Sequence, residues 1–280
     1  MNAHQNIYEI SCSQWHLLGT PMNLSVPVVF AIGDVHGQDE MLQAMHEYID
    51  TISNGEGVIV HLGDLIDRGP YGVRALRRAL SKGSQKTIVL PGNHEQFMID
   101  AIRNGDSESA YWWLKQGGRD VLVELGIIRP DQKDDYWTKM LYKNPSDLYK
   151  QIRDGLGHTY EQILKLPTSV RFGNLVCVHA GIPKGWTYEN VETFNWVDAG
   201  VPESSLAEDR SPLWVRGPFL YSKSPMPDGT IVCHGHTIFN EPQITPRRVG
   251  IDTGAYRKNG ALTMAEFRND SVRFHRTSMV

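Results

Sequence analysis

Short runs of apolar residues, each ending in a cluster of glycine, aspartate, histidine or asparagine, dominate the first hundred residues of the chain. The runs 28–32, 58–62 and 87–90 have the length and β-branched content of buried strands. Apolar residues at helical spacing follow each run, so strand, polar turn and helix repeat three times. This rhythm is typical of parallel βαβ units, in which ligands collect at the carboxyl ends of the strands. The polar clusters are therefore predicted to meet at one edge of a sheet.

The pattern changes after residue 104. Residues 105–167 are polar and helical with scattered aromatic residues, and are interpreted as a helical insertion that the aromatic residues anchor to the body of the protein. From residue 174 onward short strands return, and they predict a second, mixed or antiparallel sheet packed on the first. The expected strands of this second sheet are 175–178, 231–233, 249–251, 262–267 and 272–274.

The organisation predicted from these elements is a single α/β domain. No linker rich in serine, glycine or charge interrupts the series of motifs, so residues 26–280 are expected to form one unit. Residues 1–25 carry no candidate chemistry and are interpreted as an N-terminal extension that packs on the surface.

Composition narrows the class of function. The 280 residues are 40% hydrophobic, with a formal net charge of −4 and a sequence pI near 6.3. Nucleic-acid and membrane-surface binding use a basic face and are not expected. The first residues lack the basic and apolar regions of a signal peptide, and three cysteines make no disulfide framework. A cytoplasmic location is expected, with Cys177 and Cys233 buried in strands.

Six residues at the predicted strand ends offer oxygen or imidazole donors, which suit ions such as Mn, Fe or Zn. They are Asp34, His36, Asp64, Asn93, His179 and His236. Six ligands are too many for one tetrahedral ion with an open position. A carboxylate such as Asp64 can bridge two ions, and two ions about 3.5–4 Å apart can hold a hydroxide and clamp a phosphoryl group. The sequence therefore predicts a binuclear metal centre.

Residues next to these donors fit phosphoryl transfer. His94 lies in the third polar cluster and Asp67 in the second, and a histidine oriented by a carboxylate can protonate a leaving alkoxide. Arg68 and Arg216 are predicted to bind the phosphate through paired N–H groups. No serine or cysteine lies in a nucleophile-elbow context, which disfavours a covalent intermediate.

Four other polar residues have simpler interpretations or stay open. His61 lies within a strand and is expected only to pack there, and Arg247 and Arg248 are expected to be solvated. His234 has two open interpretations: it orients a ligand, or it contacts substrate.

The five motifs together closely resemble those of the phosphoprotein-phosphatase branch of the calcineurin-like metallophosphoesterases, and most of all its bacterial and phage serine/threonine phosphatase group. The motifs are GDVHG at 33–37, GDLIDRGP at 63–70, GNHE at 92–95, HAG at 179–181 and HGHT at 234–237. The segments 251–256 and 260–263 are also similar to that group. The resemblance covers residues 26–275, and the combination of motifs is highly specific.

The resemblance implies an α/β/β/α sandwich, two mixed sheets flanked by helices, with a dimetal site between the sheets. It implies a first ion held by Asp34, His36 and Asp64, and a second held by Asp64, Asn93, His179 and His236. It also implies that His94 is the acid with Asp67 as its partner, and that Arg68, Arg216 and Asn93 contact the substrate. Manganese is the expected metal of both ions, with iron, zinc, nickel or magnesium as alternatives.

The residues and motifs are compared with three possible functions of the protein. The leading interpretation is a phosphoprotein phosphatase that hydrolyses a phosphorylated protein or peptide, or a small phosphoester, by direct attack of a hydroxide bound to both metals. Hydrolases of diadenosine tetraphosphate share the fold and the metals and are the alternative, although Asp67 and Glu95 favour the phosphatase branch. A non-catalytic phosphate- or metal-binding module is disfavoured, because every expected ligand and the acid are present.

Overall fold

The computed structural model describes residues 8–81, 86–132, 141, 143–222, 226 and 228–279. The strands in these ranges are β1 (Tyr8–Cys12), β2 (His16–Leu17), β3 (Val29–Ile32), β4 (Val58–His61), β5 (Lys86–Val89), β6 (Ser169–Phe172), β7 (Leu175–Val178), β8 (Ile231–His234), β9 (Gln243–Ile244), β10 (Arg248–Gly250), β11 (Leu262–Arg268) and β12 (Ser271–Met279). The helices are α1 (Asp39–Ile52), α2 (Gly72–Ser81), α3 (Asn93–Asn104), α4 (Ser107–Trp113), the π-helical turn η1 (Leu114–Gly118), α5 (Arg119–Glu124), α7 (Pro145–Leu156), α8 (His158–Ile163), α9 (Tyr188–Glu192), α10 (Trp196–Ala199), α11 (Ser205–Glu208) and α12 (Gly217–Tyr221).

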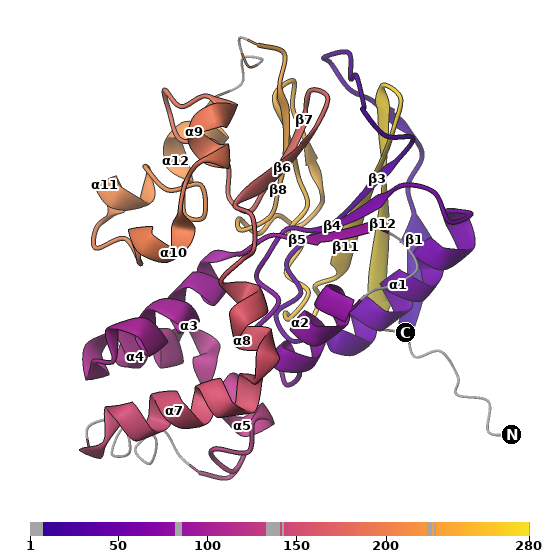
Figure 1. Cartoon of the computed structure of the whole chain (residues 1–280). Helices are drawn as coiled ribbons and strands as arrows, with labels where there is room; N and C mark the ends of the chain where they lie inside the picture. Colours follow the sequence, from indigo (N-terminus) through magenta and orange to yellow (C-terminus); the bar gives the residue numbers. More distant parts are fainter. Residues whose placement is uncertain are drawn as a thin grey trace, which may run out of the picture.

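Two β-sheets face each other at the centre of the molecule (Figure 1). The seven-stranded sheet has the order β1-β12-β11-β3-β4-β5, with β2 paired to β12, and the five-stranded sheet has the order β6-β7-β8-β10-β9. Strands β3, β4 and β5 are parallel, as the repeated strand and helix pattern predicts. Strands β7, β8 and β10 are parallel in the second sheet. Each sheet therefore brings several carboxyl strand ends to one edge.

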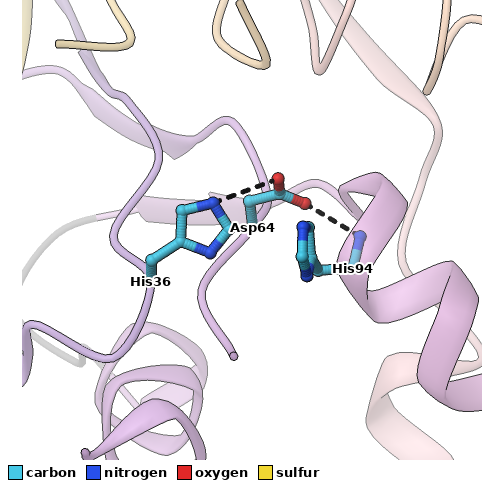
Figure 2. A group of neighbouring side chains, drawn as sticks. All are labelled: His36, Asp64 and His94. Carbon is cyan, nitrogen blue, oxygen red and sulfur yellow. Dashed lines mark hydrogen bonds and ion pairs between the residues drawn. The ribbon is translucent and has the colours of Figure 1, made fainter. Parts of the chain in front are cut away.

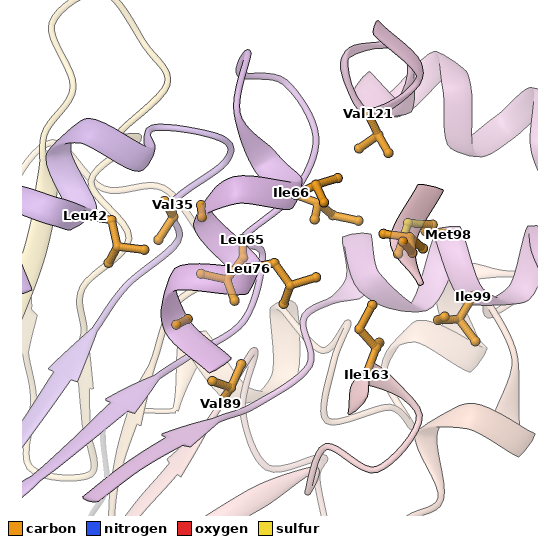
Figure 3. Packing of buried hydrophobic residues seen from close by; sticks show 14 of the residues in the cluster. Val35, Leu42, Leu65, Ile66, Leu76, Val89, Met98, Ile99, Val121 and Ile163 are labelled. Atoms are coloured by element: carbon orange, nitrogen blue, oxygen red, sulfur yellow. The ribbon is translucent and has the colours of Figure 1, made fainter. Parts of the chain in front are cut away.

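The alternation of side chains along β3 shows how the layers are stacked. Phe30 and Ile32 join an apolar cluster with residues of α1, α2 and α3, whereas Val29 and Ala31 join a cluster between the two sheets. Figure 3 shows part of the first cluster, with Leu76 of α2 close to Leu65. A third apolar cluster lies between the five-stranded sheet and α9 and α12. The order helix, sheet, sheet, helix confirms the expected α/β/β/α sandwich.

Two strands lie in a different sheet from the one expected. Residues 262–268 and 271–279 form β11 and β12, which extend the first sheet because β11 pairs antiparallel with β3. The prediction that they belong to the second sheet is wrong. Both faces of β11 are buried, so its apolar pattern shows that it is covered without showing which strand it pairs with.

The described part of the N-terminal segment lies at the edge of the first sheet. Residues 8–12 and 16–17 pair antiparallel with β12, so they add strands to that sheet. Part of this segment is nevertheless open to solvent, since Leu17 is 80% exposed. The division of the chain at residue 25 stays a prediction.

Helices α4, η1, α5, α7 and α8 fill most of residues 107–163, the stretch interpreted as a helical insertion. Trp113, Leu122 and Ile152 are fully buried in the same apolar cluster as α1 and α3, so these helices share the core of the first sheet. None of the helices in the described residues is long and apolar enough to cross a bilayer. Cys177 and Cys233 are buried and unpaired, as their strand positions predict.

Candidate metal centre and active site

The six candidate ligands come from both sheets and lie at or just after strand ends. Asp34 and His36 follow β3, Asp64 follows β4, and Asn93 begins α3 after β5. His179 follows β7, and His236 lies two residues beyond β8. All six are at least 94% buried, so they lie inside the molecule. The positions of these residues at strand ends predict that they meet; that they bind metal stays a prediction.

Asp64 lies between His36 and His94 (Figure 2). Its Oδ2 is 3.5 Å from His36 Nε2, its Oδ1 is 3.5 Å from His179 Nε2, and the same Oδ1 accepts a hydrogen bond from the backbone N–H of His94 at 3.0 Å. Two groups of side chains could each hold an ion, with donor atoms within 4.8 Å of one another: His36, Asp64 and His94, and Asp64, His179 and His236. Because Asp64 belongs to both groups, its carboxylate is placed to be shared.

Three of the imidazoles are oriented by backbone carbonyls. The pairs are His36 Nδ1 with Ile66 O at 3.0 Å, His179 Nδ1 with Leu62 O at 2.8 Å, and His236 Nε2 with Trp214 O at 3.1 Å. A carbonyl oxygen can only accept, so the nitrogen that faces it carries the proton. The other nitrogen of each ring then presents a lone pair to the cluster. This arrangement is usual for histidines that bind metal.

Asn93 shows most clearly that the cluster fits a cation. Its Oδ1 is 3.0 Å from His179 Nε2 and 2.8 Å from His236 Nδ1, the two nitrogens that the carbonyl bonds leave without a proton. With Oδ1 in this place, three lone-pair atoms lie close together and repel one another. A divalent ion bound by one oxygen and two imidazoles would remove this repulsion.

Three buried carboxylates also fit a site for a cation. Burial, with Asp252 and Asp64 close by, raises the pKa of Asp34 well above its usual range. Burial also raises the pKa of Asp252 to about 6, and Asp64 contributes to the rise. Burial acts to raise the pKa of Asp64 too, but the neighbouring His179, His94 and His36 outweigh it, so the net pKa is lowered. A divalent cation would keep all three groups ionised.

Asp252 was not singled out as a site residue from the sequence. It is 2% exposed and lies just after β10, so it ends an apolar run in the same way as the predicted ligands do. That position after Ile251 was the signal that could have found it. Tyr256 is a second residue of the site that the sequence analysis did not single out. Its ring meets the His36 ring edge-on, with the ring centroids 5.1 Å apart.

His94 differs from the other three imidazoles. Its Nδ1 lies 2.6 Å from Asp67 Oδ2, and both side chains are buried. Burial alone would lower the pKa of His94, but Asp64 and Asp67 outweigh it and raise the pKa. By contrast, burial and the neighbouring His94 lower the pKa of His36 to about 3. Burial also lowers the pKa of His179 and His236, and a neutral imidazole is the form that binds metal.

Both predicted phosphate-binding arginines lie at the cluster. Arg68 Nη1 is 3.0 Å from His36 Nε2 and donates to the Tyr256 hydroxyl at 3.4 Å. Arg216 Nη1 donates to Thr237 Oγ1 at 3.1 Å and to the backbone carbonyl of His236 at 3.3 Å. The Arg68 guanidinium therefore lies beside a candidate ligand of the first ion, His36, and the Arg216 guanidinium lies beside a candidate ligand of the second, His236. Their contact with a phosphate stays a prediction.

The remaining polar residues lie outside the cluster. His61 packs against His46, with their Nε2 atoms 3.3 Å apart, and His234 contacts Gly235 O and the Phe219 ring. Arg248 was expected to be solvated, and this expectation is wrong, since the residue is only 6% exposed. Its guanidinium lies over the Phe239 ring and donates to Leu220 O, under the cover of α12.

The fold and the buried cluster together define a metallophosphoesterase. The chain belongs to the calcineurin-like phosphoesterase family, whose sequence profile matches residues 27–270. Members of this family bind divalent metal ions, and the two groups around Asp64 could hold such ions.

Individual relatives carry two kinds of name. The chain is 28% identical over 247 residues to bis(5'-nucleosyl)-tetraphosphatase PrpE [asymmetrical] of Halalkalibacterium halodurans, covering 84% of this chain and 88% of that protein. It is 38% identical over 90 residues to serine/threonine-protein phosphatase 1 of Salmonella typhimurium, covering 32% and 38%. The chain spans 58–59% of the length of the symmetrical bis(5'-nucleosyl)-tetraphosphatases that it also matches.

Among solved structures, a serine/threonine phosphatase from Saccharomyces cerevisiae superposes with a TM-score of 0.53 at 12% identity, covering 90% of this chain and 80% of that one. An identity this low shows the fold alone.

Proposed function

We propose that this protein is a metal-dependent phosphomonoesterase that acts on phosphorylated proteins or peptides. The observation that carries the proposal is the buried pair of His94 and Asp67, 2.6 Å apart, beside the cluster centred on Asp64. Because Asp67 holds Nδ1 of His94, Nε2 is the nitrogen left to give a proton. A charged imidazole in this place is suited to protonate a departing oxygen.

The remaining residues can be assigned to binding and orientation. Ions held by Asp34, His36 and Asp64, and by Asp64, Asn93, His179 and His236, would supply Lewis-acid activation of water and of the phosphoryl group. Arg68 and Arg216 would bind the phosphoryl oxygens through their N–H groups. Arg68 lies 3.0 Å from His36 Nε2, Arg216 donates to Thr237, and Asn93 Oδ1 lies within 3.0 Å of two of the histidines. Direct transfer to water fits the absence of a serine or cysteine nucleophile from the predicted motifs.

The need for an acid distinguishes the two candidate substrates. A serine or threonine alkoxide is strongly basic, so the ester cleaves fast only when the leaving oxygen is protonated. A nucleotide phosphate leaves far more readily, because its second pKa is about 6. A buried, oriented His94 therefore benefits a phosphomonoester more than a dinucleoside polyphosphate.

The acidic lining of a neighbouring groove also favours a phosphorylated peptide over a dinucleoside polyphosphate. A groove of about 970 Å³ extends from Phe97, whose ring lies 6.3 Å from that of His94, to residues 197–203. Arg103 is its basic lining residue, and Arg103 is already paired with Asp198 at 3.1 Å. The acidic residues that line the groove are Asp100, Asp106, Glu108, Asp198 and Glu203. Such a lining repels a polyanion and tolerates a cationic peptide.

Dinucleoside polyphosphate hydrolysis is the second candidate. It is favoured by the relative named bis(5'-nucleosyl)-tetraphosphatase PrpE [asymmetrical], since the similarity to it covers 84% of this chain.

Product analysis with two substrates separates the candidates. The protein is stripped with EDTA, reloaded in turn with Mn, Fe, Zn, Ni or Mg, and given a phosphoserine peptide with basic flanks or diadenosine tetraphosphate. We expect metal-dependent release of phosphate from the peptide at a kcat/KM at least about tenfold above that for the dinucleotide, with Mn the best metal. Faster cleavage of the dinucleotide would favour the second candidate. Phosphate binding without turnover of either substrate would favour a binding module.

A further inference from the structure

Trp113, the last residue of α4, connects the helical segment 107–163 to the acid pair. Its indole is fully buried, and Nε1–H donates to Asp67 at 3.2 Å from Oδ1 and 3.1 Å from Oδ2. Asp67 Oδ2 also accepts a hydrogen bond from Nδ1–H of His94, with the two atoms 2.6 Å apart. One carboxylate is therefore held between a donor from α4 and a donor from α3.

Gly117, in the turn that follows Trp113, holds Arg68, the residue next to Asp67. Gly117 O accepts a hydrogen bond from the backbone N–H of Arg68 at 3.3 Å. Gly117 has φ +118°, and a Cβ there would lie 2.8 Å from Arg68 N. A Cβ on Gly118 would lie 2.4 Å from the indole of Trp113. Both glycines are therefore needed for η1 to pack this closely on the loop and on the indole.

The loop itself needs such support. Asp67 and Arg68 both have positive φ, 67° and 66°, which is an unfavourable conformation for residues with a side chain. Such conformations persist only where surrounding contacts hold them. The contacts from Trp113 and Gly117 come from a segment in which the sequence showed no chemistry.

We infer that Trp113 is a positioning residue for proton donation: its indole N–H fixes the carboxylate of Asp67, which in turn fixes the ring of His94. This inference rests on the proposed function, because it gives His94 the role of acid. Without the N–H, the carboxylate keeps His94 as its partner but can rotate about χ2, and the imidazole turns with it. Proton delivery then slows, while phosphate binding by Arg68 and Arg216 continues.

If Trp113 contributed only to packing, its loss would change the rates of the different esters in another way. Loss of packing lowers activity by one factor for all substrates, whereas poor proton delivery slows the esters with the most basic leaving oxygens. The dependence of rate on the leaving group therefore separates the two roles.

The test compares Trp113→Phe with Trp196→Phe in the metal-loaded protein. Trp196 is the matched control, because its buried indole donates to the carbonyl of Leu166 at 2.9 Å and not to a carboxylate. The kcat and KM are measured for p-nitrophenyl phosphate, phenyl phosphate and a phosphoserine peptide. For Trp113→Phe we expect kcat to fall about 10–100-fold for the peptide and phenyl phosphate, less than about threefold for p-nitrophenyl phosphate, and KM to change less than about twofold. His94→Asn should show the same trend more strongly.

An equal loss for all three esters, or no loss, would overturn the inference while leaving the proposed function intact. If Trp113→Phe does not fold, benzothienylalanine at position 113 removes the N–H and keeps the shape of the ring. If the wild type hydrolyses none of the esters, the proposed function fails, and the ring resonances of 15N-labelled His94 in the zinc-loaded protein decide the positioning role alone. We expect the Nδ1–H proton of His94 to be sharp in the wild type and lost to solvent exchange in either variant; an unchanged signal would overturn the inference.

Discussion

Glu95 holds the loop that presents Asp64 to the candidate ions. Its buried carboxylate accepts four backbone N–H groups: Oε2 accepts from Gly92 at 2.8 Å and Asp64 at 2.9 Å, and Oε1 accepts from Leu65 at 2.9 Å and Ile66 at 3.2 Å. Asp64 has φ +50°, a left-handed conformation that costs a residue with a side chain on the order of 1–3 kcal/mol. The four hydrogen bonds stabilise this conformation.

The substitution Glu95→Gln tests that role. An amide NH2 group cannot accept, so whichever way the glutamine is turned, two of the four N–H donors lose their acceptor. Hydrogen bonds to a charged group contribute about 1.5–3 kcal/mol each, so the two lost acceptors cost about 3–6 kcal/mol. The neutral glutamine also removes the cost of burying a charge beside Asp64, the cost that raises the pKa of Glu95 to about 7, and this gain offsets part of the loss. We therefore expect a net loss of about 1–3 kcal/mol, a lower unfolding midpoint and weaker metal binding, because Asp64 is no longer held in place.

The measurement is urea unfolding in EDTA, followed by tryptophan fluorescence, with metal binding measured separately by calorimetry. Burial and the neighbouring Asp64 raise the pKa of Glu95 to about 7 against the effect of the four donors, so the comparison is made at pH 8, where the carboxylate is ionised. Glu47→Gln on the exposed side of α1 is the matched control and should change stability by less than about 0.5 kcal/mol. If Glu95→Gln unfolds within about 0.5 kcal/mol of the wild type and binds metal as tightly, the four-donor contact does not stabilise the loop.

Asp64→Asn should remove bound metal and lower kcat/KM by more than about 100-fold, which elemental analysis and p-nitrophenyl phosphate assays check; a fully metal-loaded, active variant would contradict it. His94→Asn should lower kcat for a phosphoserine peptide by about 10²–10⁴-fold with metal content unchanged, and wild-type turnover would exclude His94 as the acid. Burial acts to raise the pKa of Glu266, but hydrogen bonds from His275 and two arginines outweigh it and lower the pKa from 4.5 to about 2. Because the folded state favours the ionised form, Glu266→Gln should cost about 1–3 kcal/mol of unfolding free energy at pH 7, and this cost should shrink as the pH falls from 4.5 towards 2. Urea unfolding at pH 7 and pH 3 measures it, and an equal cost at both would contradict the prediction.

The sequence predicted the parts of the site that depend on local pattern. An apolar run followed by a polar cluster marks a buried strand and its end, and parallel strands bring their ends together. For this reason the sequence predicts that the six ligand candidates meet, together with the neighbouring His94 and Asp67.

Features that depend on which distant segments pack together were not predictable in this way. The apolar pattern of β11 shows that both its faces are covered, but its pairing with β3 is a choice between two sheets. Trp113 lies 46 residues from Asp67 in the chain, and its indole N–H finds that carboxylate only in the folded protein. Arg248 looked like a solvated charge because the sequence does not show that α12 covers it.

The central claim is that two divalent ions share the carboxylate of Asp64. Crystals grown with manganese, measured at a wavelength where manganese scatters anomalously, test it most directly. We expect two anomalous peaks in each molecule, one on either side of the Asp64 carboxylate, with His36 beside one and Asn93, His179 and His236 beside the other. A single peak, or peaks that Asp64 does not contact, would contradict it.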